Sequence, residues 1–459
     1  MLQHSLYAQQ TLADYIESGK RNSYTSLSAN NNLKQAALAF AVFKADGKPT
    51  LSFYGNVPVY NKDNYAVTQP DGSIKFLPRS QNYSNIGFGF SQPIPSTGGA
   101  VSVNTDLYRF DDFVTKTKQY NGTPVFLRLT QPLFRYNAFK WNRKIEPLKS
   151  EEAGLQYKAT HYQLAYEICR LYFDVVTAQA DEQLAAINTA NNAANLAIEK
   201  RKVQLGVSTE DKVLQLEMQQ INSLQNRVAA QLSIRQAFLA LQTFVNSTDT
   251  ATVLLQLPKQ LPQFKFDKET AIAAAKKNMP QYLSYQRKKL ETESKIEEAR
   301  MQGRQVDLIA SFGLNNAATN LTGIYRNPQD QQRFSIGFNI PIADWGRRKN
   351  SLASAKLQQE QIDISNKQEE AELVKEITNL VNEFPVLQQN LQQAILLDTL
   401  SQRRYNIANR LFQSGKLSLL ELQSAQTEKD NARRNYIAVV RRLWESYYLF
   451  KVKTGIDNL

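Results

Sequence analysis

The chain has 459 residues, of which 42% are hydrophobic and 21% are charged, so it is a folded protein and not a disordered tail. The formal net charge of +13 does not indicate a nucleic-acid-binding protein, because the basic residues are spread among Gln and Glu on helical segments without interleaved aromatic residues. We interpret them as solvated helix faces, with attraction to anionic lipid or to a partner as the alternative.

The N-terminal residues have the character of a processing signal. Ser5-Leu6-Tyr7-Ala8, followed by Gln9-Gln10, is similar to the end of a secretory signal, where small residues precede the cleavage point. The charged start and the apolar run that normally precede such a site are absent from the printed chain. We therefore expect that the start is truncated.

Alternating segments in both halves of the chain predict β-strands. Each segment places apolar residues on one face and small or polar residues on the other, as a sheet with one face in contact with water requires. The alternating apolar residues are Val101, Val103 and Leu107, then Val125, Leu127 and Leu129, then Leu308, Ala310, Phe312 and Leu314, and finally Phe334, Ile336, Phe338 and Ile340. A soluble antiparallel sheet packed on helices is an alternative that this pattern alone leaves open.

The chain also contains an internal repeat. Pro132 and Pro341 each end an alternating run, and each is followed by a basic cluster and a long helical pattern, at about 140–205 and 347–413. Gly206 and Gly415 interrupt these patterns after the same interval, and both glycines suit the left-handed turn of a helical hairpin. Each long helix would measure roughly 100 Å at 1.5 Å per residue, which no ordinary globular domain accommodates.

The order of strands, long helices and hairpins resembles the TolC family over nearly the whole chain from about residue 11. The most specific stretches are Leu127-Arg128-Leu129-Thr130-Gln131-Pro132-Leu133-Phe134 and Ser335-Ile336-Gly337-Phe338-Asn339-Ile340-Pro341-Ile342. The resemblance implies an α+β membrane protein that forms a homotrimer. Its 12-stranded outer-membrane β-barrel would take four strands from each protomer and continue into a long periplasmic α-helical barrel.

We divide the chain on this basis. The expected segments are 1–49 for N-terminal periplasmic helices, 50–136 for the first strands with an extended insert at about 58–98, 137–250 for the first long helix and hairpin helix, 251–305 for an equatorial segment and helix, 306–345 for the second strands, and 346–459 for the second long helix and hairpin helix. The roles of the added strand-like segments 51–57 and 84–94 stay open.

The resemblance also implies a periplasmic gate at the hairpin turns, held by polar links and narrowed by acidic side chains. Glu421 follows the Gly415 turn, while Glu210 and Asp211 follow the Gly206 turn, and Phe412 stands where an aromatic gate residue is expected. The alternative for the three acids is a helix first turn, where a carboxylate offsets the positive end of the helix dipole.

No catalytic, cofactor or metal site is predicted. The chain has one cysteine and two histidines, His4 and His161, and neither histidine has a metal-ligand neighbour at useful spacing. The resemblance implies the passive exit duct of a tripartite efflux pump for small molecules in the bacterial outer membrane, working with a periplasmic adaptor and an inner-membrane pump. A duct for type I protein secretion and a soluble periplasmic coiled-coil adaptor are the alternatives.

Overall fold

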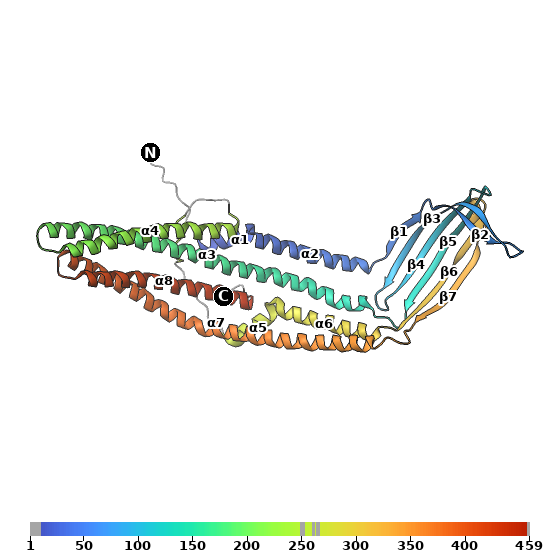
Figure 1. Ribbon diagram of the computed structural model, residues 1–459. Helices are drawn as coiled ribbons and strands as arrows, with labels where there is room; N and C mark the ends of the chain where they lie inside the picture. Colours follow the sequence, from blue (N-terminus) through green and yellow to red (C-terminus); the bar gives the residue numbers. More distant parts are fainter. Residues whose placement is uncertain (1–10, 248–252, 259–261, 263–266, 457–459) are drawn as a thin grey trace, which may run out of the picture. The chain divides into compact units, whose positions relative to one another are not determined.

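The computed structural model describes residues 11–247, 253–258, 262 and 267–456, so the signal-like Ser5–Gln10 segment lies outside it (Figure 1). The chain divides into two compact units. The helical unit takes its described residues from 1–35, 152–283 and 367–459, and the sheet unit consists of 36–151 and 284–366. Each unit is described by itself below.

Eight α-helices lie in the described residues. Their bounds are α1 Leu12–Asn22, α2 Tyr24–Asp46, α3 Ala138–Gln204, α4 Glu210–Val245, α5 Lys268–Asn278, α6 Pro280–Met301, α7 Arg347–Gln413 and α8 Leu419–Thr454. Helices α3 and α7 each have 67 residues, and α4 and α8 each have 36. None of the described helices combines the length and the apolar character that a transmembrane helix requires.

The core of the helical unit follows the three-and-four spacing of helices that pack side by side. On α7 the buried stripe includes Ile377, Leu380, Phe384, Leu387 and Leu391, and on α8 it includes Ile437, Val440, Leu443 and Phe450. On α3 the same cluster contains Leu164, Ile168, Tyr172 and Val175. The sequence places an apolar residue at nearly every inward position here, so burial of these stripes holds the unit together.

Seven strands form the sheet unit's single antiparallel sheet. They are β1 Thr50–Asn56, β2 Tyr60–Thr68, β3 Ile74–Ile94, β4 Gly99–Asp112, β5 Thr117–Pro132, β6 Gln305–Ala318 and β7 Gln329–Asn339. The order is β1-β3-β4-β5-β6-β7, and β2 also pairs with β3. A short 3-10 helix, Thr322–Tyr325, lies between β6 and β7.

One row of side chains shows how the strands align. Leu51 of β1 lies opposite Phe90, Phe90 opposite Val103, Val103 opposite Leu127, and Leu127 opposite Phe312. Because neighbours in a strand point to opposite faces, the register gathers the alternating apolar residues on one face of the sheet. Ser52, Gly89 and Asn104 align in the same way on the other face.

The sheet has more strands than the resemblance implies for the barrel. The resemblance implies four barrel strands from each protomer, and the sheet of this chain has seven strands. The additional strands come from the insert and the segment before it, because residues within 58–98 form β2 and all of β3, while most of the 51–57 segment lies in β1. Strong turn formers in the insert, at Asp71-Gly72 and at Gly98, have glycine φ angles of 82° and 74° and allow the chain to reverse.

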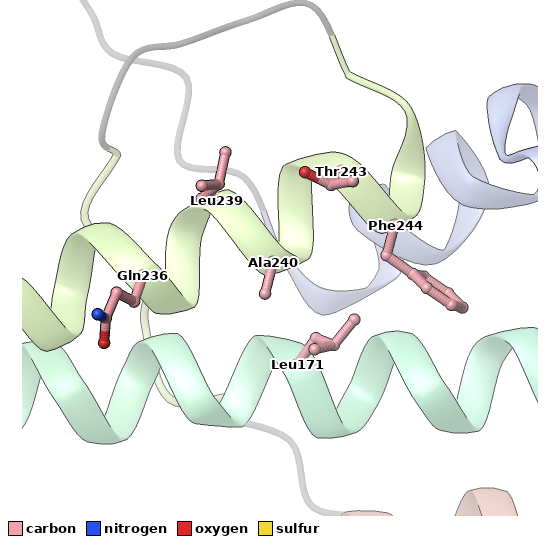
Figure 2. Close-up of a pocket in the computed structure, with 6 residues that line it drawn as sticks. All are labelled: Leu171, Gln236, Leu239, Ala240, Thr243 and Phe244. Carbon is pink, nitrogen blue, oxygen red and sulfur yellow. The ribbon is translucent and has the colours of Figure 1, made fainter.

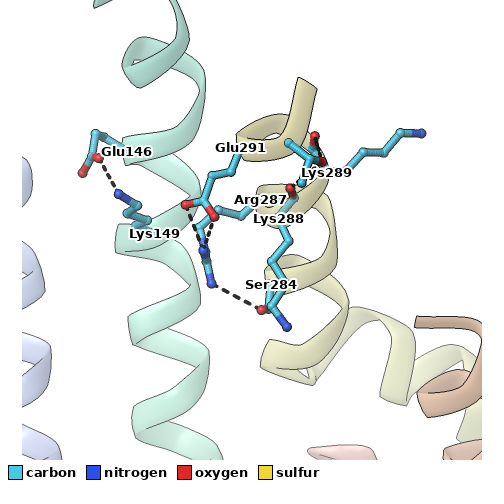
Figure 3. A network of polar contacts seen from close by, with 8 residues as sticks. Glu146, Lys149, Ser284, Arg287, Lys288, Lys289 and Glu291 are labelled. Atoms are coloured by element: carbon cyan, nitrogen blue, oxygen red, sulfur yellow. Dashed lines mark hydrogen bonds and ion pairs between the residues drawn. The ribbon is translucent and has the colours of Figure 1, made fainter. Parts of the chain in front are cut away.

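Two ion pairs on helices of the sheet unit form within single helices. Lys149 Nζ lies 2.8 Å from Glu146 on α3, and Arg287 lies 2.9 Å from Glu291 on α6, where it also donates to Ser284 (Figure 3). Pairs three or four residues apart on one helix contribute less than about 1 kcal/mol each. These two pairs support individual helices.

Candidate gate at the helical hairpins

Two hairpin turns of the same geometry end the long helices. The Gly206 N–H donates to the Val203 carbonyl and the Val207 N–H to the Lys202 carbonyl, and Gly415 and Lys416 repeat both bonds with Phe412 and Leu411. This is a Schellman turn, which needs a left-handed residue after the helix. Gly206 has a φ of 68° and Gly415 a φ of 75°. Their lack of a side chain makes that conformation inexpensive.

The strand-to-helix landmarks sit at the other end of the repeat. Pro132 is the last residue of β5, and Pro341 lies two residues after the end of β7. A proline here costs little, because the ladder of hydrogen bonds between strands is ending.

Glu421 is a helix-capping residue. The Ser418 hydroxyl donates to its carboxylate at 2.6 Å and the Ser418 N–H at 3.0 Å, while the Glu421 N–H donates back to the Ser418 hydroxyl. This reciprocal capping box satisfies the first backbone groups of α8. The hydrogen bonds from the Ser418 hydroxyl and N–H lower the pKa of Glu421.

The acids of the first hairpin have another arrangement. Glu210 and Asp211 lie in the first turn of α4, but the N-cap residue Thr209 makes no side-chain capping bond. Asp211 accepts a hydrogen bond from Gln215 at 2.8 Å. The hairpins are therefore alike in backbone and different in the way their second helices begin.

The Glu421 cap should give the start of α8 a pH dependence. Because the folded pKa is lowered, the cap stabilises α8 above the carboxyl's ordinary pKa of 4.5, and this contribution is lost as the pH falls through the lower folded value. We expect amide hydrogen exchange in the first turn of α8, corrected for intrinsic rates, to accelerate between pH 7 and pH 3. In Ser418→Ala the same turn should already be destabilised at pH 7, by about 1 kcal/mol.

The first hairpin provides the control for this experiment. Thr209→Ala, at the equivalent cap of α4, should leave exchange in α4 unchanged, since Thr209 makes no capping bond. Equal effects of the two substitutions would contradict the capping role of Ser418 and Glu421.

A polar ladder lies along α3 between the core and its hairpin. Asn191 donates to the Tyr405 hydroxyl at 3.0 Å, and Asn195 donates to Asn409 at 3.3 Å. Closer to the turn, Lys202 pairs with the buried Glu199 at 3.3 Å. The inward face of α3 thus changes from apolar to polar. The stability of such an interface depends on its buried polar groups keeping their partners, because an unpaired polar group in the interior is costly.

Lys429 belongs to the same ladder from the side of α8. Its ammonium group donates to the side-chain amide oxygen of Asn188 at 3.0 Å, lies 3.1 Å from the Asp430 carboxylate, and covers the Tyr405 ring at 4.5 Å. Asn188 in turn donates to Asp430 at 2.6 Å. The lysine side chain is only 3% exposed, so a charge occupies a core position of α8. Hydrogen bonds and a counter-charge offset its desolvation.

Phe412 packs inside the hairpin and is not an exposed gate residue. Its ring is 5% exposed and belongs to a cluster with Leu216, Tyr405 and Leu422. Lys202 lies over the ring and donates to the Phe412 carbonyl at 3.5 Å. The burial follows from spacing, because Phe412 continues the inward stripe of Tyr405 and Ala408. Any part in gating therefore acts through the packing of the hairpin base.

The ladder residues were missed by sequence reasoning. Asn188, Asn195 and Glu199 look like ordinary solvated residues of an alanine-rich helix, but each is less than 10% exposed. The available signal was their spacing, since they continue the inward stripe of α3 toward the hairpin.

Comparison with known proteins decides the family. Residues 80–247 and 293–446 match the family model described as outer membrane efflux protein. The chain belongs to this family. Membership makes it an outer-membrane efflux protein, and it overrides the alternative of a soluble periplasmic adaptor. No curated protein matches the chain in sequence.

Solved outer-membrane proteins share the fold of this efflux protein. The Campylobacter jejuni CmeC outer membrane channel is 14% identical with a TM-score of 0.70, over 97% of this chain and 85% of that chain. The outer membrane protein VceC of Vibrio cholerae is 13% identical with a TM-score of 0.69, over 97% and 96%. The Neisseria gonorrhoeae MtrE outer membrane channel, in its open state, is 15% identical with a TM-score of 0.66, over 96% and 88%.

Proposed function

We propose that three copies of this efflux protein form the exit duct of a tripartite efflux pump, which passively carries small molecules out through the outer membrane. The observation that carries the proposal is the uncovered apolar face of the sheet. Phe53, Phe88, Leu127, Phe312 and Phe338 are all exposed on one side. Lipid is the environment in which such a face is stable, with the small polar face turned to a water-filled lumen.

The α4 stripe supports assembly of several copies. Leu214, Met218, Ile221, Val228, Leu232 and Leu239 of α4 are spaced by three, four or seven residues and are all more than half exposed. They lie on the face of α4 opposite its buried residues, such as Leu216 and Leu241. A shallow apolar groove beside the end of the stripe is lined by Leu239, Ala240 and Phe244 of α4 and by Leu171 of α3, and the Leu239 side chain points away from α3 (Figure 2).

The α7 stripe is a second such surface. It consists of Val386, Leu397, Leu400, Ile407 and Leu411, which are 37–54% exposed and lie beside the buried stripe of α7. By contrast, α3 and α8 each carry few large exposed apolar residues. We infer that the α4 stripe of one copy packs on the α7 stripe of the next, because heptad-spaced apolar faces are the surfaces that helices use to pair.

The duct gains its closed state, in this proposal, from the polar ladder near the hairpins. Three copies of Glu421, with Glu210 and Asp211, would ring the axis and favour cations. The ladder would hold each pair of hairpins together until a periplasmic adaptor and an inner-membrane pump dock. No step of this cycle requires a catalytic residue or a cofactor in the chain, since the pump supplies the energy.

Channel recording tests the gate. Removing the Asn191–Tyr405 hydrogen bond with Tyr405→Phe costs about 1 kcal/mol per copy. In three copies this shifts the closed–open equilibrium by about 3 kcal/mol, or roughly 100-fold. We expect the purified protein in planar bilayers to conduct poorly and Tyr405→Phe to open far more often.

Tyr436→Phe, which removes a hydroxyl away from the ladder, is the control. Silence of both the native protein and Tyr405→Phe would contradict the channel.

Partner capture distinguishes efflux from protein secretion. We expect in-cell cross-linking of the full chain, followed by mass spectrometry, to recover a periplasmic adaptor with an efflux pump. Deletion of the gene should then raise the susceptibility of the cells to small toxic compounds. Recovery of a protein-secretion transporter, with loss of a secreted protein and unchanged susceptibility, would instead identify the type I secretion duct.

A further inference from the structure

The sheet has more strand paths than the four expected for one copy of a family member. The first half of the chain crosses the sheet four times, as β1 with β2, then β3, β4 and β5, and the second half crosses it twice, as β6 and β7. β1 and β2 count as one path because they follow each other along the same side of β3. Asn82 pairs with Tyr60 of β2 and with Asp111 of β4, so β2 lies on the side of β3 away from β4, as β1 does.

The added paths form a complete hairpin that reaches the helix end of the sheet. At the β3–β4 turn, Asn137, just before α3, donates to the carbonyls of Pro95 and Ser96. Gln92 of β3 donates to the carbonyl of Gly47, just after α2. The insertion therefore extends along the sheet as far as the other strands do. Because a hairpin adds two antiparallel strands, the chain still enters α3 from the same end of the sheet.

β1 is anchored on both faces of the sheet. On the apolar face the Phe53 and Phe88 rings lie 4.7 Å apart. On the polar face the Tyr54 hydroxyl reaches across β3 at Gly87 and donates to Asp106 of β4 at 2.7 Å. A Cβ on Gly87 would lie 2.3 Å from the Asp106 carboxylate and 2.7 Å from the Tyr54 ring, so only glycine leaves room for this bridge.

β1 also has the same alternation of apolar and polar residues as the other strands of the sheet. Leu51 and Phe53 are exposed on the apolar face, and Ser52 lies on the polar face. At the opposite edge, β7 exposes Phe334, Ile336 and Phe338 on the apolar face, with Ser335 and Gly337 between them. Both edges have unpaired backbone groups, and in lipid these require a partner strand.

We propose that each copy contributes six strand paths to the membrane wall, and that β7 of one copy pairs with β1 of the next. This inference rests on the proposed trimer. Three copies then form an eighteen-stranded barrel, and the neighbour's strand completes a wall that one chain leaves open. Because barrel diameter grows roughly linearly with strand number, the wall would be about 1.5 times as wide as one of twelve strands.

Cysteine cross-linking tests the seam. Ser52→Cys on β1 is combined in one chain with Ser335→Cys, Gly337→Cys or Asn339→Cys on β7, since all four positions lie on the polar face. A disulfide needs Cβ atoms about 4 Å apart, so one pair should cross-link copies into covalent trimers on mild oxidation. The native Cys169 is buried, and burial raises the pKa of its thiol, so it stays unreactive.

Two variants make the outcome decisive. Ser102→Cys, on the polar face of the inner strand β4, should give no cross-link with any β7 position. Gly87→Leu should displace β1 and abolish the Ser52 cross-links while the helical stripes keep the copies together. Cross-links from Ser102 in place of Ser52 would mean that β7 meets β4 in a twelve-stranded wall, which overturns the inference.

An image reconstruction of the purified protein separates this inference from the proposed function. Eighteen strands around a three-fold axis support both. A trimer with twelve strands in the wall, and the β1–β3 segment outside it, overturns the inference and leaves the duct intact. A protein that stays monomeric in detergent and in lipid contradicts the duct and the seam together.

Discussion

Leu232→Asp on the α4 stripe should disassemble the protein into single copies. Leu232 is 56% exposed in one chain, and we propose that the α7 stripe of a neighbouring copy covers it. Burial of a leucine side chain contributes about 1.5–3 kcal/mol, and a carboxylate at that place adds the cost of an unpaired charge. The α4–α7 interface between each pair of neighbouring copies should therefore weaken by at least about tenfold. Light scattering or native mass spectrometry of the purified protein measures the trimer fraction.

Two matched substitutions distinguish a defect in assembly from a defect in folding. Leu232→Met keeps the volume and apolar character of the side chain and should leave the trimer intact. Gln231→Asp adds the same charge to the exposed neighbouring residue, about a quarter turn away from the stripe, and should also preserve it. If Leu232→Asp assembles as well as Gln231→Asp does, the α4 stripe is not an interface between copies.

Lys429→Met should loosen the hairpins because it leaves a partly buried carboxylate without its cation. Asp430 is 13% exposed and lies 3.1 Å from the Lys429 ammonium group. Removing one partner of a buried pair costs about 3–5 kcal/mol, whereas replacing both partners is often nearly neutral. We expect hydrogen exchange along the middle of α8 to accelerate by more than about 100-fold. The same variant should raise channel opening in planar bilayers.

The double substitution Lys429→Met with Asp430→Asn is the decisive comparison. The amide that replaces the Asp430 carboxylate would keep the polar contact with Asn188, and no unpaired charge would remain. Most of the lost stability should then return. If the double variant is as unstable as Lys429→Met alone, the lysine acts through its packing and not through its charge.

Local patterns along the chain predict the helical plan of this protein. Periodicity depends on residues that are near in the chain, and the inward stripes of α7 and α8 repeat every three or four residues. The two Schellman glycines were visible for the same reason, because a left-handed residue between long helices leaves few choices but glycine. The spacing of Pro132 and Pro341 with Gly206 and Gly415 likewise came from the chain alone.

Contacts between segments far apart in the chain set which polar residues face inward and how many strands form the sheet. Asn188 and Lys429 are typical surface residues in composition, and they become a ladder because α3 and α8 pack against each other there. The inserted segment alternates less clearly than the other strands, so its place depends on pairing with partners far along the chain. The Tyr54–Asp106 bridge over Gly87 joins residues of different strands, and a local pattern cannot encode such a contact because it exists only after the register is set.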